Sequence, residues 1–338
     1  MRGSQGRRVA VALLIGAVAG VAMAGAAPAA TQWDFSLFVG ITHPVGQYHK
    51  EFADEVKKRT GGALEIIVRP AGELPYKPTE VARVVGEGTL PLADGYMGFI
   101  AGDAKVSSLP GMPFLVGTAE ELQKAMELFE PLARKELDRF GVTILFWYTW
   151  PPQNVWGRGK PITTIDEFKG RKIRTTSPEQ TEMLKRFGAV PVSFTTAEVP
   201  PAAQRGAMEA VLTASFNLLG AKWYEFSEWG YIPDIHIGGP SYILVNKKAL
   251  EGLPADVRTA LQAVAKEFHD RMLKEIPARD ADARKVLVEQ HKIRLILPQP
   301  GDKEKGRKIM EPYWEQWAKD RGPAGVEALQ AVRKALGR

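Results

Sequence analysis

Apolar and polar residues alternate along much of the chain with the periods of short strands and helices. Alternation predicts a strand at 34–40 and another at 64–68, and Val45, Tyr48 and Phe52 lie on one apolar stripe of a helix between them. Further strands are expected at 92–97, 142–148 and 241–246, and further helices at 79–86, 118–140, 254–290 and 326–336. Strands and helices that follow one another in this way predict an α/β fold.

The clearest stretch lies between Thr164 and Thr213. Its start has the Thr-x-x-Glu pattern of a capping box, and Ser177 before a proline is typical of a second helix start. Residues 171–174 and 190–194 read as strands between the helices. Such alternation indicates parallel strands, and parallel sheets bind ligands beyond the carboxyl ends of their strands. Arg174 stands at such an end.

The N-terminus has the pattern of an export signal. Three arginines precede an apolar, small-residue run at 9–27, which leads into an Ala-Pro-Ala cleavage pattern near Ala29. We expect residues 1–30 to be a signal peptide that sends the protein to the periplasm, with a single membrane anchor as the alternative. An arginine pair leaves open whether export follows the general secretory or the twin-arginine route.

Composition narrows the class further. The formal net charge of +6 falls to +3 without the three arginines of the signal, which indicates neither nucleic acid nor a membrane surface as partner. The chain has no cysteine, so its stability must come from a large core rather than from disulfides. The remaining length predicts two domains, 31–150 with 240–279 and 151–239 with 280–338, and a ligand cleft between them. The helix expected at 254–290 is long enough to reach across both.

No enzyme or metal motif stands out. The five histidines are scattered, with no two at a spacing that would hold a metal on one helix face. The sequence has no nucleophile-elbow, metalloprotease, phosphate-loop or complete dinucleotide-binding motif. We therefore expect no catalysis, no cofactor and no metal, and a triad assembled from distant residues is the alternative.

Several stretches match one family. The most specific is 168–211, with its K-G-x-K-I-R strand, G-A-x-P turn and E-x-x-x-A-x-x-x-G helix, supported by 57–74, 109–116 and 242–254. The chain resembles the periplasmic solute receptors of tripartite ATP-independent (TRAP) transporters, the dicarboxylate-receptor family. The resemblance implies a two-domain clamp like that of other periplasmic binding proteins, with mixed sheets, hinge strands and a long domain-spanning helix. Such receptors close on a small organic anion and deliver it to two membrane subunits that are driven by sodium gradients.

The resemblance also implies binding residues. Arg174 falls at the family's carboxylate-binding arginine, and a guanidinium grips a carboxylate through two charge-assisted hydrogen bonds; the alternative is a solvated side chain in a basic run. Gln153 lies where many members carry a second arginine, so a second carboxylate would lack an obvious partner, although the amide can donate and accept. A branch with glutamine there binds 2-oxo and 2-hydroxy acids together with a metal held by acidic residues. The segment 212–214 has no carboxylate, so no metal is expected. Thr213 either donates to the ligand or packs in the core.

Aromatic residues gather near these positions. Trp150 and Phe216 neighbour Gln153 and Thr213 in sequence and are expected to line the cleft. The opposing wall is expected from the first domain, from Tyr96, Phe99 and His43. Flat apolar walls with one cation favour an aromatic or otherwise apolar monocarboxylate.

The sequence therefore predicts a monomeric solute receptor that captures a small organic acid by hinge closure. Within that class, a short 2-oxo or 2-hydroxy acid or a dicarboxylate is the alternative ligand. A secreted enzyme with an unrecognised site and a ligand-sensing module for a receptor kinase are the alternatives outside it.

Overall fold

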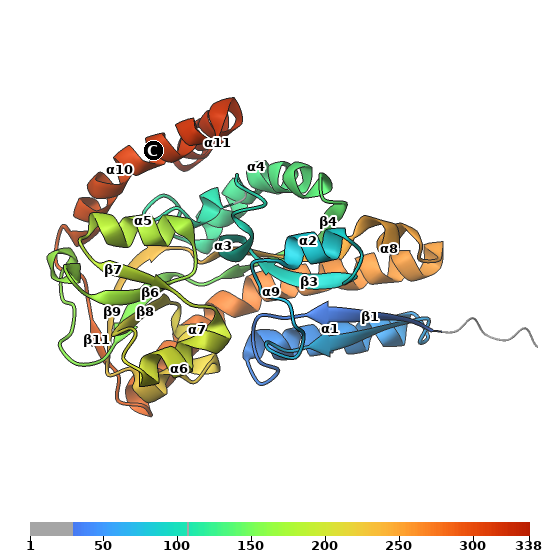
Figure 1. Cartoon of the computed structure of the whole chain (residues 1–338), viewed down its shortest axis with the longest axis horizontal. Helices are drawn as coiled ribbons and strands as arrows, with labels where there is room; N and C mark the ends of the chain where they lie inside the picture. Colours follow the sequence, from blue (N-terminus) through green and yellow to red (C-terminus); the bar gives the residue numbers. More distant parts are fainter. Residues whose placement is uncertain (1–29, 107) are drawn as a thin grey trace, which may run out of the picture.

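The computed structural model describes residues 30–106 and 108–338. The expected signal peptide and its cleavage near Ala29 lie outside the described residues. Two β-sheets lie side by side with helices around them (Figure 1). We call them and their helices the first and the second lobe.

The first lobe is built on a five-stranded sheet of order β2-β1-β3-β10-β4. β1 pairs in parallel with β2 and β3, whereas β10 pairs antiparallel with β3 and β4, so the sheet is mixed as expected. Its strands are β1 (Thr31–Ser36), β2 (Leu64–Arg69), β3 (Leu92–Tyr96), β4 (Val142–Trp150) and β10 (Gly239–Asn246). The helices along this part of the chain are α1 (Pro44–Arg59), α2 (Val81–Gly86), α3 (Met97–Ile100), α4 (Ala119–Asp138) and α8 (Lys247–Glu251).

The second lobe is built on a six-stranded sheet of order β11-β9-β5-β8-β6-β7. β6 pairs in parallel with β7 and β8, as the alternating pattern of 164–213 predicts, and the neighbouring β5 is antiparallel. Its strands are β5 (Gln153–Gly157), β6 (Lys172–Thr175), β7 (Val190–Ser193), β8 (Ala210–Thr213), β9 (Trp229–His236) and β11 (Arg294–Ile296). The helices here are α5 (Pro178–Arg186), α6 (Val199–Gln204) and α7 (Ser215–Gly220), with 3₁₀ turns at Ile165–Phe168, Thr196–Glu198 and Trp223–Phe226; a further 3₁₀ turn, Leu109–Gly111, packs on α4 and β10 of the first lobe.

Three segments connect the lobes. β4 leads into β5 through two prolines, and β9 returns to β10 through a Gly-Gly pair. Gly238 donates its N–H to the Trp150 carbonyl, and a Cβ there would lie 2.3 Å from Trp150 Cβ, so the two strands cross closely only with glycine at this point. The third segment is α9 (Ala255–Glu289), which packs on α1 and β4 of the first lobe and on α7 of the second, as Figure 1 shows. The long helix is therefore domain-spanning, as predicted.

The two C-terminal helices pack on different lobes. α10 (Asp302–Asp320) contacts α5 and β9 in the second lobe, and α11 (Gly322–Leu336) packs on α4 of the first. Apolar residues of both lobes form one continuous buried cluster, with a smaller cluster around Trp156 and Trp223. The domain boundaries proposed from the sequence stay a prediction.

Local details differ from the sequence prediction at two places. The first strand spans 31–36 rather than 34–40. Thr164 begins a 3₁₀ turn but makes no side-chain cap, so the predicted capping box is wrong. Glu167 instead accepts from the backbone N–H and the hydroxyl of Thr163, one residue earlier, which satisfies the same turn.

No helix in the described part of the chain is both long and apolar enough to cross a membrane. Nor do its histidine and acidic side chains form a group of three or more that could hold a metal ion.

Candidate functional site

A small cavity lies where the two lobes meet. Six of the eight residues proposed from the sequence line it, namely Tyr96, Phe99, Trp150, Gln153, Arg174 and Thr213. Four further lining residues were not anticipated, namely Phe38, Thr176, Thr196 and Asn217. The cavity has a volume of about 30 Å³, which is room for about two water molecules. The lobes are thus closed over it.

Strand topology brings the polar residues together. β6, β7 and β8 are parallel neighbours, so their carboxyl ends meet at one edge of the sheet. Arg174 lies near the end of β6, and its Nε donates to the carbonyl of Phe194, which follows β7, at 2.9 Å. Thr213 ends β8. This edge faces the first lobe, and a Cβ on Gly98 of α3 would lie only 2.7 Å from the carbonyl of Thr176.

Arg174 is a buried cation without a carboxylate partner. Its side chain is 2% exposed, and its Cζ lies 5.0 Å from the ring centroid of Trp223. No carboxylate of the residues described here forms an ion pair with it. Burial lowers the pKa of the guanidinium to about 9, opposed in part by Tyr96 and Glu198. A buried charge in this state is stabilised by an anion that enters the cavity.

Hydrogen-bonding groups surround the guanidinium. The Asn217 amide donates to Thr213 Oγ1 at 2.9 Å, so the Thr213 hydroxyl proton remains to donate elsewhere. Gln153 donates to the carbonyl of Pro151 at 2.8 Å, which fixes its side chain in the cavity wall. Tyr96 donates to the carbonyl of Gly238 at 2.9 Å, and burial raises the pKa of its hydroxyl to about 12, so it keeps its proton.

Aromatic rings form the opposing wall. Phe38 lies 5.4 Å from Phe99 and 5.8 Å from Trp150, and Tyr96 lies 5.4 Å from Phe99, measured between ring centroids. The indole N–H of Trp150 donates to Ser241 at 3.0 Å, which holds the ring in place. The wall is apolar, and its rings meet at angles of 44° to 83° rather than lying in one plane.

Two of the proposed residues lie behind the cavity rather than in its lining. The rings of His43 and Phe216 pack edge-to-face at 5.5 Å, and both lie within 6.3 Å of the Trp150 ring. His43 caps α1 by accepting from the N–H of Val45 at 3.1 Å. Burial lowers the pKa of His43 to about 3, with the Asn217 side chain opposing, so the ring is neutral. Both residues support the Trp150 wall from the interface between the lobes.

The four unanticipated residues carry little signal in the sequence. Asn217 is a polar residue in the short apolar helix α7, four residues after Thr213 at the end of β8, and this closeness in sequence is the one clue that it faces the same cavity. Phe38, Thr176 and Thr196 lie in connections whose course only the fold defines.

Comparison with known proteins gives the family. The profile described as bacterial extracellular solute-binding protein, family 7, matches residues 35–320. The C4-dicarboxylate-binding periplasmic protein DctP of Rhodobacter capsulatus is 29% identical over 241 residues, 70% of this chain and 71% of the relative. A solute-binding protein of Albidiferax ferrireducens is 27% identical over 259 residues, 70% of each chain.

Solved structures agree with this result. DctP7, an extracytoplasmic solute receptor of Bordetella pertussis that binds pyroglutamic acid, superposes with a TM-score of 0.84 at 27% identity, over 90% of this chain and 100% of its own. A marine metagenome TRAP solute-binding protein specific for pyroglutamate gives 0.81 at 25% identity, over 90% and 99%. The family consists of transport receptors for small organic acids, not enzymes. The chain therefore belongs to family 7 of the bacterial extracellular solute-binding proteins, the periplasmic receptors of TRAP transporters.

Proposed function

We propose that this receptor binds a small monocarboxylate with a flat or apolar body, and that the carboxylate pairs with Arg174. The observation that supports this most is the burial of the Arg174 guanidinium without an anionic partner. A planar guanidinium offers a carboxylate two parallel hydrogen bonds, which a lysine cannot do. The Thr213 hydroxyl and the Asn217 amide are the nearby groups that can complete the carboxylate's hydrogen bonds.

The number of cations sets the charge of the ligand. Arg174 is the one cationic residue in the described lining of the cavity, and Gln153 lies where, by the family resemblance, many receptors carry a second arginine. A second carboxylate held in this cavity beside Arg174 would be buried without a cationic partner, which is costly. The side chains of Phe38, Phe99 and Trp150 favour contact with an apolar part of the ligand. Receptors similar to this one bind pyroglutamate, a ring-bearing monocarboxylate.

Capture would proceed by closure of the lobes. Arg174, Thr213 and Asn217 come from the second lobe and the aromatic wall from the first, so a ligand that touches both stabilises the closed arrangement. We propose that the closed, loaded receptor acts as a monomer in the periplasm and that the membrane subunits of the transporter recognise this form.

A ligand screen tests the proposal. Thermal-shift measurements with aromatic acids, pyroglutamate, short 2-oxo and 2-hydroxy acids and dicarboxylates should give the largest shift with a ring-bearing monocarboxylate. A preference for dicarboxylates would contradict our interpretation of Gln153.

Calorimetry on two variants then tests the role of Arg174. Arg174→Lys should weaken binding of the best acid because the bidentate geometry is lost. Lys172→Ala, on the same strand but exposed, is the matched control and should bind as the parent does. Equal loss in both variants, or none in either, would place the carboxylate elsewhere.

A further inference from the structure

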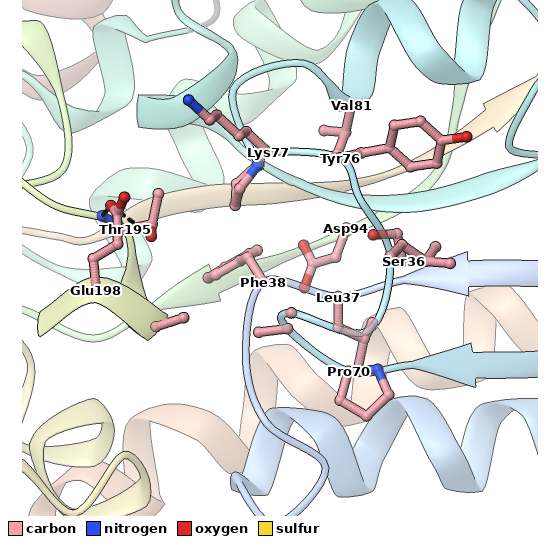
Figure 2. A pocket seen from close by; sticks show the side chains of 15 residues that line it. Ser36, Leu37, Phe38, Pro70, Tyr76, Lys77, Val81, Asp94, Thr195 and Glu198 are labelled. Atoms are coloured by element: carbon pink, nitrogen blue, oxygen red, sulfur yellow. Dashed lines mark hydrogen bonds between the residues drawn. The ribbon is translucent and has the colours of Figure 1, made fainter. Parts of the chain in front are cut away.

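A second cavity lies beside the first and is several times larger. Its volume is about 170 Å³, against about 30 Å³ at Arg174. Ser36 and Leu37 at the end of β1, the segment 70–78 and Asp94 line it from the first lobe, and Thr195, Ala197 and Glu198 from the second. Figure 2 shows Asp94 between Phe38 and Ser36, with Thr195 and Glu198 on the second-lobe side.

The two cavities are neighbours. Phe38 lines both, and Thr196 of the first cavity lies between Thr195 and Ala197 of the second in the chain. The charges also interact, since Glu198 opposes the lowering of the Arg174 pKa. Phe38 therefore forms part of the wall of both cavities.

Asp94 offers this cavity an unused hydrogen-bond acceptor. The residue is 1% exposed, and its Oδ2 accepts from the Tyr148 hydroxyl at 2.7 Å and lies 3.1 Å from His49 Nε2. Burial, together with the Asp94 charge, raises the pKa of Tyr148 well above its usual value, so the hydroxyl stays a donor. Oδ1 has no hydrogen-bond partner within the described residues. A buried acceptor left unpaired is unfavourable, so this position favours a donor from a ligand.

The volume and the polarity of the second cavity together determine which part of a ligand it can hold. The space at Arg174 holds about two waters and has no room for a ring, whereas the second cavity does. We propose that the body of the ligand extends past Phe38 into this cavity and that a hydroxyl or N–H at its far end donates to Asp94 Oδ1. The inference rests on the proposed function and narrows its ligand to monocarboxylates that carry a hydrogen-bond donor away from the carboxylate.

Matched pairs of acids test this, with and without the donor. The pairs are 4-hydroxybenzoate and benzoate, 4-hydroxyphenylacetate and phenylacetate, and 3-(4-hydroxyphenyl)propanoate and 3-phenylpropanoate. In calorimetry on the full protein, at least one donor-bearing acid should bind about tenfold or more tightly than its partner, since hydrogen bonds to charged groups are among the stronger ones. No advantage in any pair would overturn the subsite.

Two variants locate the effect. Asp94→Asn keeps an acceptor for Tyr148 but can turn an amide N–H toward the cavity, so the advantage of the donor should disappear. Because Asp94 lies in the core, Ala197→Leu serves as the second variant: it fills the cavity from an exposed position and should weaken the favoured donor-bearing acid at least tenfold. An unchanged advantage in Asp94→Asn, or unchanged affinity in Ala197→Leu, would contradict the proposal.

Failure of the subsite can be told apart from failure of the function. If acids bind through Arg174 but show no preference for a hydrogen-bond donor, the subsite proposal is wrong and the proposed function still stands. If no acid of the series binds, or if binding is independent of Arg174, the proposed function is wrong and the subsite with it.

Discussion

Replacing Arg174 by methionine should let the lobes close without a ligand. In the closed arrangement the guanidinium is 2% exposed, and its pKa falls from the ordinary 12.5 to about 9. At about 1.36 kcal/mol per pKa unit, keeping the charge there costs about 5 kcal/mol. Methionine is apolar and unbranched and reaches about as far as the arginine Nε, so it fills part of the space beside Trp223 without a charge. Closing the empty variant should thus be easier than closing the empty parent by up to about 5 kcal/mol.

The distance between the lobes reports this directly. Small-angle scattering of the ligand-free proteins should give a smaller radius of gyration for Arg174→Met than for the parent, and an acid ligand should compact only the parent. Lys172→Met, two residues earlier on the same strand and exposed, is the control and should behave as the parent. An empty Arg174→Met variant that is as open as the empty parent would refute the claim that the buried charge opposes closure.

The same variant should lose its ligand. Removing one partner of a buried, hydrogen-bonded charge pair costs about 3–5 kcal/mol, which is roughly a hundred- to several-thousand-fold in affinity. Calorimetry with the best acid of the screen measures this. An affinity within a few-fold of the parent would show that the carboxylate binds elsewhere.

Three further changes have defined outcomes. Gln153→Arg supplies a second cation, so calorimetry should show a gain in dicarboxylate affinity; no gain would mean that cation count does not set the ligand class. Gly98→Val adds a side chain where a Cβ already lies 2.7 Å from the Thr176 carbonyl of the other lobe and 2.7 Å from Tyr96 Cε1 of its own, so calorimetry should show binding weakened tenfold or more; an affinity near that of the parent would contradict this. Burial raises the pKa of Asp280 to about 6 from 3.8, so its contribution to stability is complete below pH 3.8 and is lost as pH rises through 6. Asp280→Asn should remove this pH-dependent loss of about 3 kcal/mol in the free energy of unfolding. In urea unfolding, the variant should therefore gain more stability over the parent at pH 7.5 than at pH 4. An equal gain at both pH values would contradict this.

The sequence predicts the elements of the second lobe well, because each carries its own local signal. Ser177 does cap α5 by accepting from Gln180 N–H, and β6 and β7 lie where alternation places them. The carboxyl end of a parallel strand then puts Arg174 at the sheet edge that faces the first lobe. At Thr164 the sequence pattern correctly marks the start of a turn, but the predicted hydrogen-bond partner is wrong. Glu167 accepts from Thr163, the residue before Thr164.

Other parts of the site depend on long-range packing that periodicity does not reveal. β5 and β9 are buried strands of irregular composition whose pairing is defined by the crossing between the lobes. Trp223 reads as core and is buried, yet its ring also lies against the guanidinium of Arg174. Phe216 neighbours Thr213 in sequence, but its ring packs on His43 behind the wall. The second cavity arises from four segments far apart in the chain, so no local pattern could indicate it.

A crystal structure with the best-binding acid tests the central claim most directly. The proposed binding mode predicts both carboxylate oxygens within about 2.7–2.9 Å of Arg174 guanidinium nitrogens, with the body of the ligand against Phe38 and Trp150. A ligand whose carboxylate pairs with another residue, while the Arg174 guanidinium faces solvent or protein alone, would contradict it.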